Sequence, residues 1–151
     1  MNINEKPTKP EDLQPTSRFL RACNGLPVDA TPVWFMRQAG RYMPEYRAIR
    51  EKYSLLEIVS HPEIAAEVTL QPVEILGVDA AILFADILLV VQPMGLHLEF
   101  VKGEGPVISN PIRQLKDVEK LRVMDARSDL GHVMKAIQLV RAALTDQVPL
   151  I

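Results

Sequence analysis

The sequence predicts a parallel α/β fold that forms the N-terminal part of a larger barrel. Apolar runs and helical patterns alternate along the chain, which is the order of a parallel sheet with right-handed crossover helices. The run that starts at Val78 loses its apolar–polar alternation over residues 80–84, as parallel strands covered on both faces do. A third apolar run occupies residues 148–151. Three such strands alone would leave a hydrophobic edge unpaired, so we expect this chain to be the first part of a barrel that is truncated in its third strand.

Length and composition limit the class of protein. The chain has 151 residues, well below the roughly 250 residues of a (β/α)8 barrel, so one domain or part of one is expected. A net charge of −2 disfavours a nucleic-acid partner held by phosphate neutralisation. Without an apolar run of about 18 residues, no membrane span is expected. Cys23 is the only cysteine, which excludes an intrachain disulfide and fits a reducing cytoplasmic compartment.

The N-terminal region divides into a tail and the start of the domain. Residues 1–16 are polar, acidic and rich in proline. They predict a flexible tail rather than a secretory signal, with residues 17–151 as the domain. A short helix is expected between Thr16, a possible cap, and Gly25, a stop signal. The first strand is then predicted at residues 33–36.

Two helices are expected between the first and second strands. A charged helix should begin after Pro44. The spacing of Ser60 and Glu63 is that of a capping box, and Gly77 is a typical helix end. Pro72 lies between them and removes one hydrogen bond, so a kink or a break is expected there.

The second half of the chain adds a hairpin and one more helix. The second strand is predicted to end near Phe84, parallel and adjacent to the first. Residues 96–109 alternate around a glycine-containing turn, which predicts a hairpin inserted outside the barrel wall. Residues 128–144 predict a helix. Its apolar stripe consists of Leu130, Val133, Ile137, Val140 and Leu144.

Charged residues follow the first two predicted strands. Arg37 comes directly after the first strand, and Asp86 lies just past the second. Sites in parallel α/β sheets form at the C-terminal ends of the strands. Arg41 lies one helical turn from Arg37, or across a bend that Gly40 permits, so both guanidinium groups can face one anionic ligand. Guanidinium groups bind carboxylates or phosphates through two hydrogen bonds, so the pattern predicts an anion clamp.

Two structural interpretations remain open at this point. Arg37 and Asp86 can form an ion pair at the rim of the sheet without any ligand. Asp86 can also cap the segment that follows it.

Three motifs resemble a known family. They are "FMRQAGRYMPEYR", "VTLQPVEILGVDAAILFADIL" and "KGEGP". Over residues 17–151 the chain closely resembles the N-terminal portion of uroporphyrinogen decarboxylase. The resemblance implies part of a TIM barrel and a cytoplasmic lyase, homodimeric when full length, of porphyrin, haem and chlorophyll biosynthesis. Such an enzyme converts uroporphyrinogen III to coproporphyrinogen III by removing four acetate carboxylates, without a cofactor. Its ligand would be the tetrapyrrole, with no nucleic-acid or membrane partner, and the fragment alone would be inactive.

The resemblance also implies the site residues. Asp86 and Arg37 would be catalytic. The substrate-binding residues would be Arg37, Gln38, Ala39, Gly40, Arg41, Arg50 and Asp86. An acetate arm loses carbon dioxide once a pyrrole carbon is protonated, and that intermediate is cationic. An ionised Asp86 that accepts the pyrrole N–H bonds would stabilise it, while the arginines would hold the acidic arms. The proton donor is left open, because the pKa of arginine is too high for an acid at neutral pH.

Other interpretations compete with this enzyme. A related barrel class transfers methyl groups from corrinoids with zinc, and the chain can also be a non-catalytic folding piece. The three histidines, His61, His97 and His132, do not have metal-ligand spacing, so no metal site is predicted. Trp34, Phe35 and Met36 are expected in the core or in a pocket wall.

Overall fold

The computed structural model describes residues 15–101 and 103–151. The predicted tail, residues 1–16, therefore lies almost wholly outside the described residues. In chain order the elements are α1 (Arg18–Cys23), α2 (Pro44–Lys52), α3 (Leu55–Ser60), α4 (Pro62–Leu76), the 3-10 helix η2 (Ile87–Val91), β1 (Leu98–Val101), β2 (Gly105–Ile108), α5 (Leu115–Val118), α6 (Ala126–Asp129) and α7 (Gly131–Ala143).

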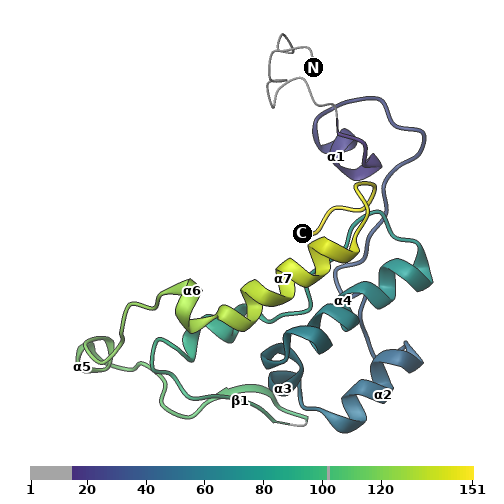
Figure 1. Cartoon of the computed structure of the whole chain (residues 1–151). Coiled ribbons are helices and arrows are strands. Elements are labelled where there is room, and N and C mark those ends of the chain that lie inside the picture. The colour runs from purple at the N-terminus through teal and green to yellow at the C-terminus, as the bar shows by residue number, and fades with distance from the viewer. Residues whose placement is uncertain (1–14, 102) are drawn as a thin grey trace, which may run out of the picture.

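Helices α4 and α7 form the centre of the fold. They pack side by side, and α2 and α3 pack against α4 (Figure 1). One core cluster consists of Met43, Tyr46, Ile58 and Val68. A second cluster consists of Val59, Leu89 and Leu130. The elements spread from α1 at one end to α5 at the other (Figure 1).

The regular sheet of the described residues is a hairpin. Strands β1 and β2 pair antiparallel, with Leu98 opposite Ile108 and Val101 opposite Gly105. The turn between them uses glycine where the backbone has positive φ, at Gly103 (93°) and Gly105 (87°). This conformation suits glycine because other residues would bring a Cβ atom into conflict with the backbone. The hairpin lies within the range of residues 96–109 in which the sequence predicts one.

The two strands predicted at 33–36 and 79–84 do not form a regular ladder, which corrects that expectation. The segments are adjacent, because the Asp79 N–H donates to the Val33 carbonyl at 2.8 Å. Side chains occupy other backbone groups that a ladder would use. The Val33 N–H donates to Asp79 Oδ2 at 2.7 Å, and Gln38 Nε2 donates to the Ala80 carbonyl at 3.1 Å. The other edge of the second segment does pair, through a parallel bridge between Ala81 and Leu150.

The apolar side chains of the first segment are not core residues in this structure. Trp34, Phe35 and Met36 are 39%, 53% and 80% exposed, whereas the sequence predicts them in the core or in a pocket wall. The described residues cover Trp34 and Phe35 only in part and leave Met36 largely exposed.

The residues that cap the helices are not the ones that the sequence predicts. Ser17, not Thr16, caps α1, and the Thr16 hydroxyl donates to the Asp146 carbonyl instead. The capping box forms at Ser54 and Glu57 and opens α3. Ser60 is the last residue of α3, and its hydroxyl donates back to the Leu56 carbonyl at 2.6 Å. The N-cap residue of α4 is His61, whose side chain makes no capping hydrogen bond.

Helix α4 ends where the sequence predicts, whereas the last predicted helix is divided. Helix α4 continues across the buried Pro72 without a break and ends at Gly77, which has a φ of 64°. The helix predicted at 128–144 is divided in two. Asp125 caps α6 through the N–H groups of Arg127 and Ser128, and α7 starts only at Gly131.

No helix in the described ranges is long and apolar enough to span a lipid bilayer.

Candidate active site

The arginine-rich loop connects the first extended segment to helix α2. Gln38 is the anchor of this loop, because its side chain is only 2% exposed. Its Nε2 donates to the Ala80 carbonyl at 3.1 Å, and its Oε1 accepts the Phe35 N–H at 3.3 Å. A buried amide with both ends bonded fixes the backbone on either side of it. Gln38 therefore holds the loop against the segment that leads to Asp86.

The second half of the loop is closed by side chains from within it. The Tyr42 hydroxyl donates to the Gln38 carbonyl. Arg47 Nη1 donates to the carbonyl of Arg41 at 2.9 Å. A Cβ atom at Gly40 would lie 3.1 Å from Cε1 of the Tyr42 ring, so a larger residue there would push the ring away. Close packing of the ring explains the glycine, since its φ is not positive.

The remaining predicted loop residues point in two directions. Ala39 packs against the cluster of Met43, Tyr46, Ile58 and Val68. Arg37 and Arg41 are exposed. Within the described residues neither guanidinium group forms an ion pair. Their charges are therefore uncommitted, as a site for an anionic ligand requires.

Arg41 and Arg50 line one cavity, between α2 and the hairpin. The cavity has a volume of about 610 Å³. Its lining residues are Arg41, Arg50, Leu55, Phe100, Val101, Gly103 and Gly105. Arg50 Nη1 also donates to the Tyr53 carbonyl at 2.6 Å, which fixes the direction of its side chain. Two guanidinium groups on one cavity can bind two acidic groups of a ligand.

Arg37 and Asp86 are not part of that cavity. Asp86 is half-buried and is the N-cap of η2, with Oδ1 accepting the Leu88 N–H at 2.8 Å. The capping interpretation of Asp86 is thus correct for this oxygen. Within the described residues Oδ2 accepts no hydrogen bond, so the cap leaves one carboxylate oxygen for a ligand.

Comparison with known proteins gives the family. The family described as "Uroporphyrinogen decarboxylase (URO-D)" matches residues 14–151. The chain belongs to the uroporphyrinogen decarboxylase family. It is similar to the uroporphyrinogen decarboxylases of Roseiflexus sp. (strain RS-1), with 60% identity over 135 residues, and of Trichlorobacter lovleyi, with 61% identity over 135 residues. The alignments cover 89% of this chain and 39% of each relative. The protein of the same name from Sorangium cellulosum is 60% identical over 134 residues, 89% of this chain and 38% of that relative.

The structure also bears on the interpretation of Arg37 and Asp86 as an ion pair. The ion pairs among the described residues join Arg18 to Asp29 and Asp79, Lys120 to Asp117, and Arg122 to Asp129. None includes Arg37 or Asp86. The structure therefore gives no support to the interpretation of these two charges as partners of each other.

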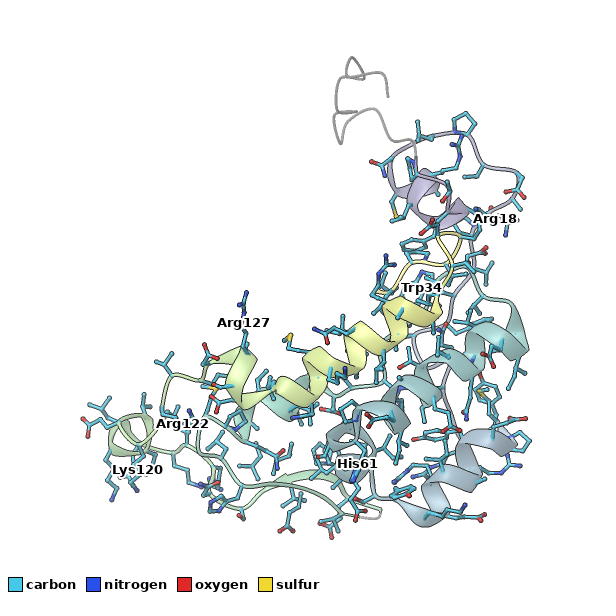
Figure 2. All side chains as sticks on the ribbon, in the orientation of Figure 1. Arg18, Trp34, His61, Lys120, Arg122 and Arg127 are labelled. Atoms are coloured by element: carbon cyan, nitrogen blue, oxygen red, sulfur yellow. The ribbon has the colours of Figure 1, made fainter. Side chains whose placement is uncertain are left out.

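Sequence reasoning missed the residues that organise the far side of the fold. Arg18 binds Asp29 at 2.7 Å and Asp79 at 2.6 Å, and so connects α1 to the second extended segment. Figure 2 shows Arg18 at the α1 end of the molecule, far from the hairpin. Asp79 is 61 residues away in the sequence, so no local pattern signals this contact.

Among the residues that the structure describes, no three histidine, cysteine or acidic side chains form a group that could hold a metal ion.

Proposed function

We propose that the complete protein is a uroporphyrinogen decarboxylase. It removes the four acetate carboxylates of uroporphyrinogen III and releases coproporphyrinogen III, as a carboxy-lyase that needs no cofactor. One observation carries the proposal: nearly the whole chain matches the family, with about 60% identity to proteins of that name. The chain spans 39% of the length of these relatives, so the described residues form only part of the active enzyme and are inactive alone.

We propose a (β/α)8 barrel for the complete protein, with residues 33–36, 79–84 and 148–151 as its first three strands. The parallel bridge between Ala81 and Leu150 supports this order. The hydrogen bond from the Asp79 N–H to the Val33 carbonyl supports it too. The exposed side chains of Phe35 and Met36 then find their cover in the rest of the barrel. We place this enzyme in the cytoplasm as a homodimer.

The proposed chemistry begins with a proton on a pyrrole carbon. The ring becomes cationic, the bond between the acetate methylene and its carboxylate breaks, and its electron pair neutralises the ring as carbon dioxide leaves. A second proton then converts the exocyclic methylene to methyl, and the ring carbon gives up the first proton. Asp86 Oδ2 accepts pyrrole N–H bonds and stabilises the cation, while Oδ1 remains on Leu88.

The loop supplies the anion-binding groups. Arg37 and Arg41 hold acidic arms of the macrocycle, and Arg50 adds a third cation on the cavity that Arg41 also lines. Gln38, Ala39 and Gly40 shape the backbone between the arginines. Because Gln38 is buried and bonded to Ala80, its contribution to binding is to hold the backbone of the loop in place.

The test uses this chain completed with the remaining C-terminal part of the Roseiflexus relative. The purified protein is incubated without oxygen with uroporphyrinogen III, and the oxidised products are separated by chromatography. Stepwise loss of carboxylates down to coproporphyrin is the expected result. A folded protein that leaves uroporphyrinogen intact would contradict the proposal. Zinc analysis of the same sample distinguishes the corrinoid-dependent methyltransferase, which would hold zinc.

A further inference from the structure

Thr69 lies in the middle of α4 and is 1% exposed. Its hydroxyl makes two hydrogen bonds. It donates to the Ala65 carbonyl one turn earlier at 2.7 Å and accepts the N–H of Phe84 at 2.8 Å. The second bond crosses from the helix to the end of the second extended segment. A threonine in a helix needs only the first bond, so the second one fixes something outside the helix.

The segment has a backbone edge that lacks a regular partner. Ala81 and Leu83 donate their N–H groups to Pro149 and Ile151 on one edge, at 2.9 and 3.1 Å. The Ala80 carbonyl and the Phe84 N–H take no part in these bonds. Side chains bind these two groups instead: Gln38 binds the carbonyl of Ala80, and Thr69 binds the N–H of Phe84.

Phe84 is also held through its ring. The ring lies 5.5 Å from that of Tyr46, centroid to centroid, and packs against both core clusters. Backbone and side chain together make Phe84 a fixed point between α4 and α2. Asp86 follows two residues later, and Oδ1 bonds to the Leu88 N–H. The position of its carboxylate thus depends on where the chain leaves Phe84.

We propose that Thr69 is a positioning residue for Asp86. Its hydroxyl fixes the end of the strand, so that Asp86 Oδ2 lies where the cationic intermediate forms. The inference rests on the proposed function of Asp86. It adds a residue on the outer helix that contacts no substrate and acts through the Phe84 backbone. Electrostatic stabilisation depends on such placement, because displacement of a charged group by about 1 Å can cost about a hundredfold in rate.

Two substitutions separate the hydroxyl from the packing. Thr69→Val keeps the volume and removes the acceptor for the Phe84 N–H. Thr69→Ser keeps the acceptor and removes a buried methyl group. In the completed enzyme we expect Thr69→Val to lower kcat about tenfold, with KM nearly unchanged, because the charge acts mainly in the transition state. Thr69→Ser should lower Tm and retain kcat close to that of the wild type.

The anchor itself is tested by hydrogen–deuterium exchange at the Phe84 amide, which needs no substrate. The amide should be protected in the wild type and in Thr69→Ser, and should exchange faster in Thr69→Val. Val140→Ala is the matched control, because Val140 is fully buried on α7 and has no bond to this segment. It should lower Tm without changing kcat below the melting transition.

A double variant decides whether Thr69 acts through Asp86. If it does, Thr69→Val should cause little further loss of kcat in the Asp86→Asn background. Full additivity overturns the inference, and so does normal kcat in Thr69→Val. Equal losses of kcat in the Val and Ser variants would also overturn it, as they would show a packing role. If the wild type itself removes no carboxylate, the proposed function fails and the positioning role fails with it.

Discussion

The carboxylate oxygens of Asp86 have separate environments. Oδ1 accepts the Leu88 N–H at 2.8 Å, and within the described residues Oδ2 accepts no hydrogen bond. Substitution by asparagine can therefore separate the capping role of Asp86 from the role of its charge. Asparagine caps helices about as well as aspartate but carries no charge.

Asp86→Asn should lower the kcat of the completed enzyme by about a hundredfold or more and leave Tm nearly unchanged. The charge is lost from the cationic transition state, whereas the amide oxygen keeps the bond to Leu88. Asp86→Glu should retain partial activity. Asp125→Asn is the control, because Asp125 also caps a short helix, α6, through its side chain. Near-normal turnover of Asp86→Asn would leave Asp86 with the cap role alone.

Arg37→Ala and Arg41→Ala should each lower kcat/KM tenfold or more. Each loses charge-assisted contacts of about 1.5–3 kcal/mol. Lysine should restore little, because one ammonium group cannot make two parallel hydrogen bonds. Tm should hold, since neither side chain forms an ion pair among the described residues. Arg127 extends outward from α6 (Figure 2), so Arg127→Ala is the control. Wild-type kcat/KM in both loop variants would rule out the clamp.

The sequence indicates where the proposed site residues lie along the chain but cannot give their contacts. Arg37 and Asp86 each follow an apolar segment, which periodicity identifies. The partners of Gln38 and Thr69 lie elsewhere: Gln38 binds Ala80, far along the chain, and Thr69 binds Phe84. Such contacts depend on tertiary packing, so local pattern cannot predict that these side chains replace a strand ladder.

At the level of elements, the end of α4 can be predicted from the sequence, whereas its start cannot. Gly77 ends α4 where glycine alone is unstrained, and this was readable from the sequence. The start of α4 was not, because Ser54 and Ser60 both precede a glutamate by three residues. In the structure the box forms at Ser54, and Ser60 belongs to α3. The strands at 33–36 and 79–84 have apolar sequences, but a regular ladder also requires backbone partners.

A pair of glycines tests the backbone argument. A Cβ atom would meet nothing within 4 Å at Gly77 or at Gly131, yet only Gly77 has a positive φ. Gly77→Ala should therefore destabilise the completed protein by about 1 kcal/mol or more through strain alone. Gly131→Ala should stabilise it by about 0.5–1 kcal/mol, because alanine favours a helix. Denaturant unfolding measures both, and changes of the same sign would contradict this account.

The attachment of α1 should depend on pH. The Arg18 guanidinium, through its hydrogen bond to Asp29, holds the pKa of that carboxyl well below its ordinary value. A depressed folded-state pKa contributes stability that is present above the ordinary value of about 3.9 and is lost as the pH falls below it. The urea midpoint of the wild type should exceed that of Asp29→Asn near neutral pH, and the difference should shrink below about pH 4. The effect should be small, because Asp29 is exposed. A constant difference would contradict the assignment.

On the scale of the whole molecule, exposed apolar side chains lie next to the proposed site residues in the chain. Phe35 and Met36 precede the arginine loop, and Ile87, 90% exposed, follows Asp86. These residues flank both halves of the proposed site. In the barrel that we propose, the same region would form a closed, apolar mouth, where charged contacts to a ligand are stronger than at a surface.

A crystal structure of the completed enzyme with coproporphyrinogen, prepared without oxygen, tests the central claim most directly. The account predicts Asp86 Oδ2 within hydrogen-bond distance of the pyrrole N–H groups, Oδ1 still on Leu88, and Arg37 and Arg41 on the acidic arms. A macrocycle bound elsewhere, or one whose pyrrole nitrogens face away from Asp86, would contradict it.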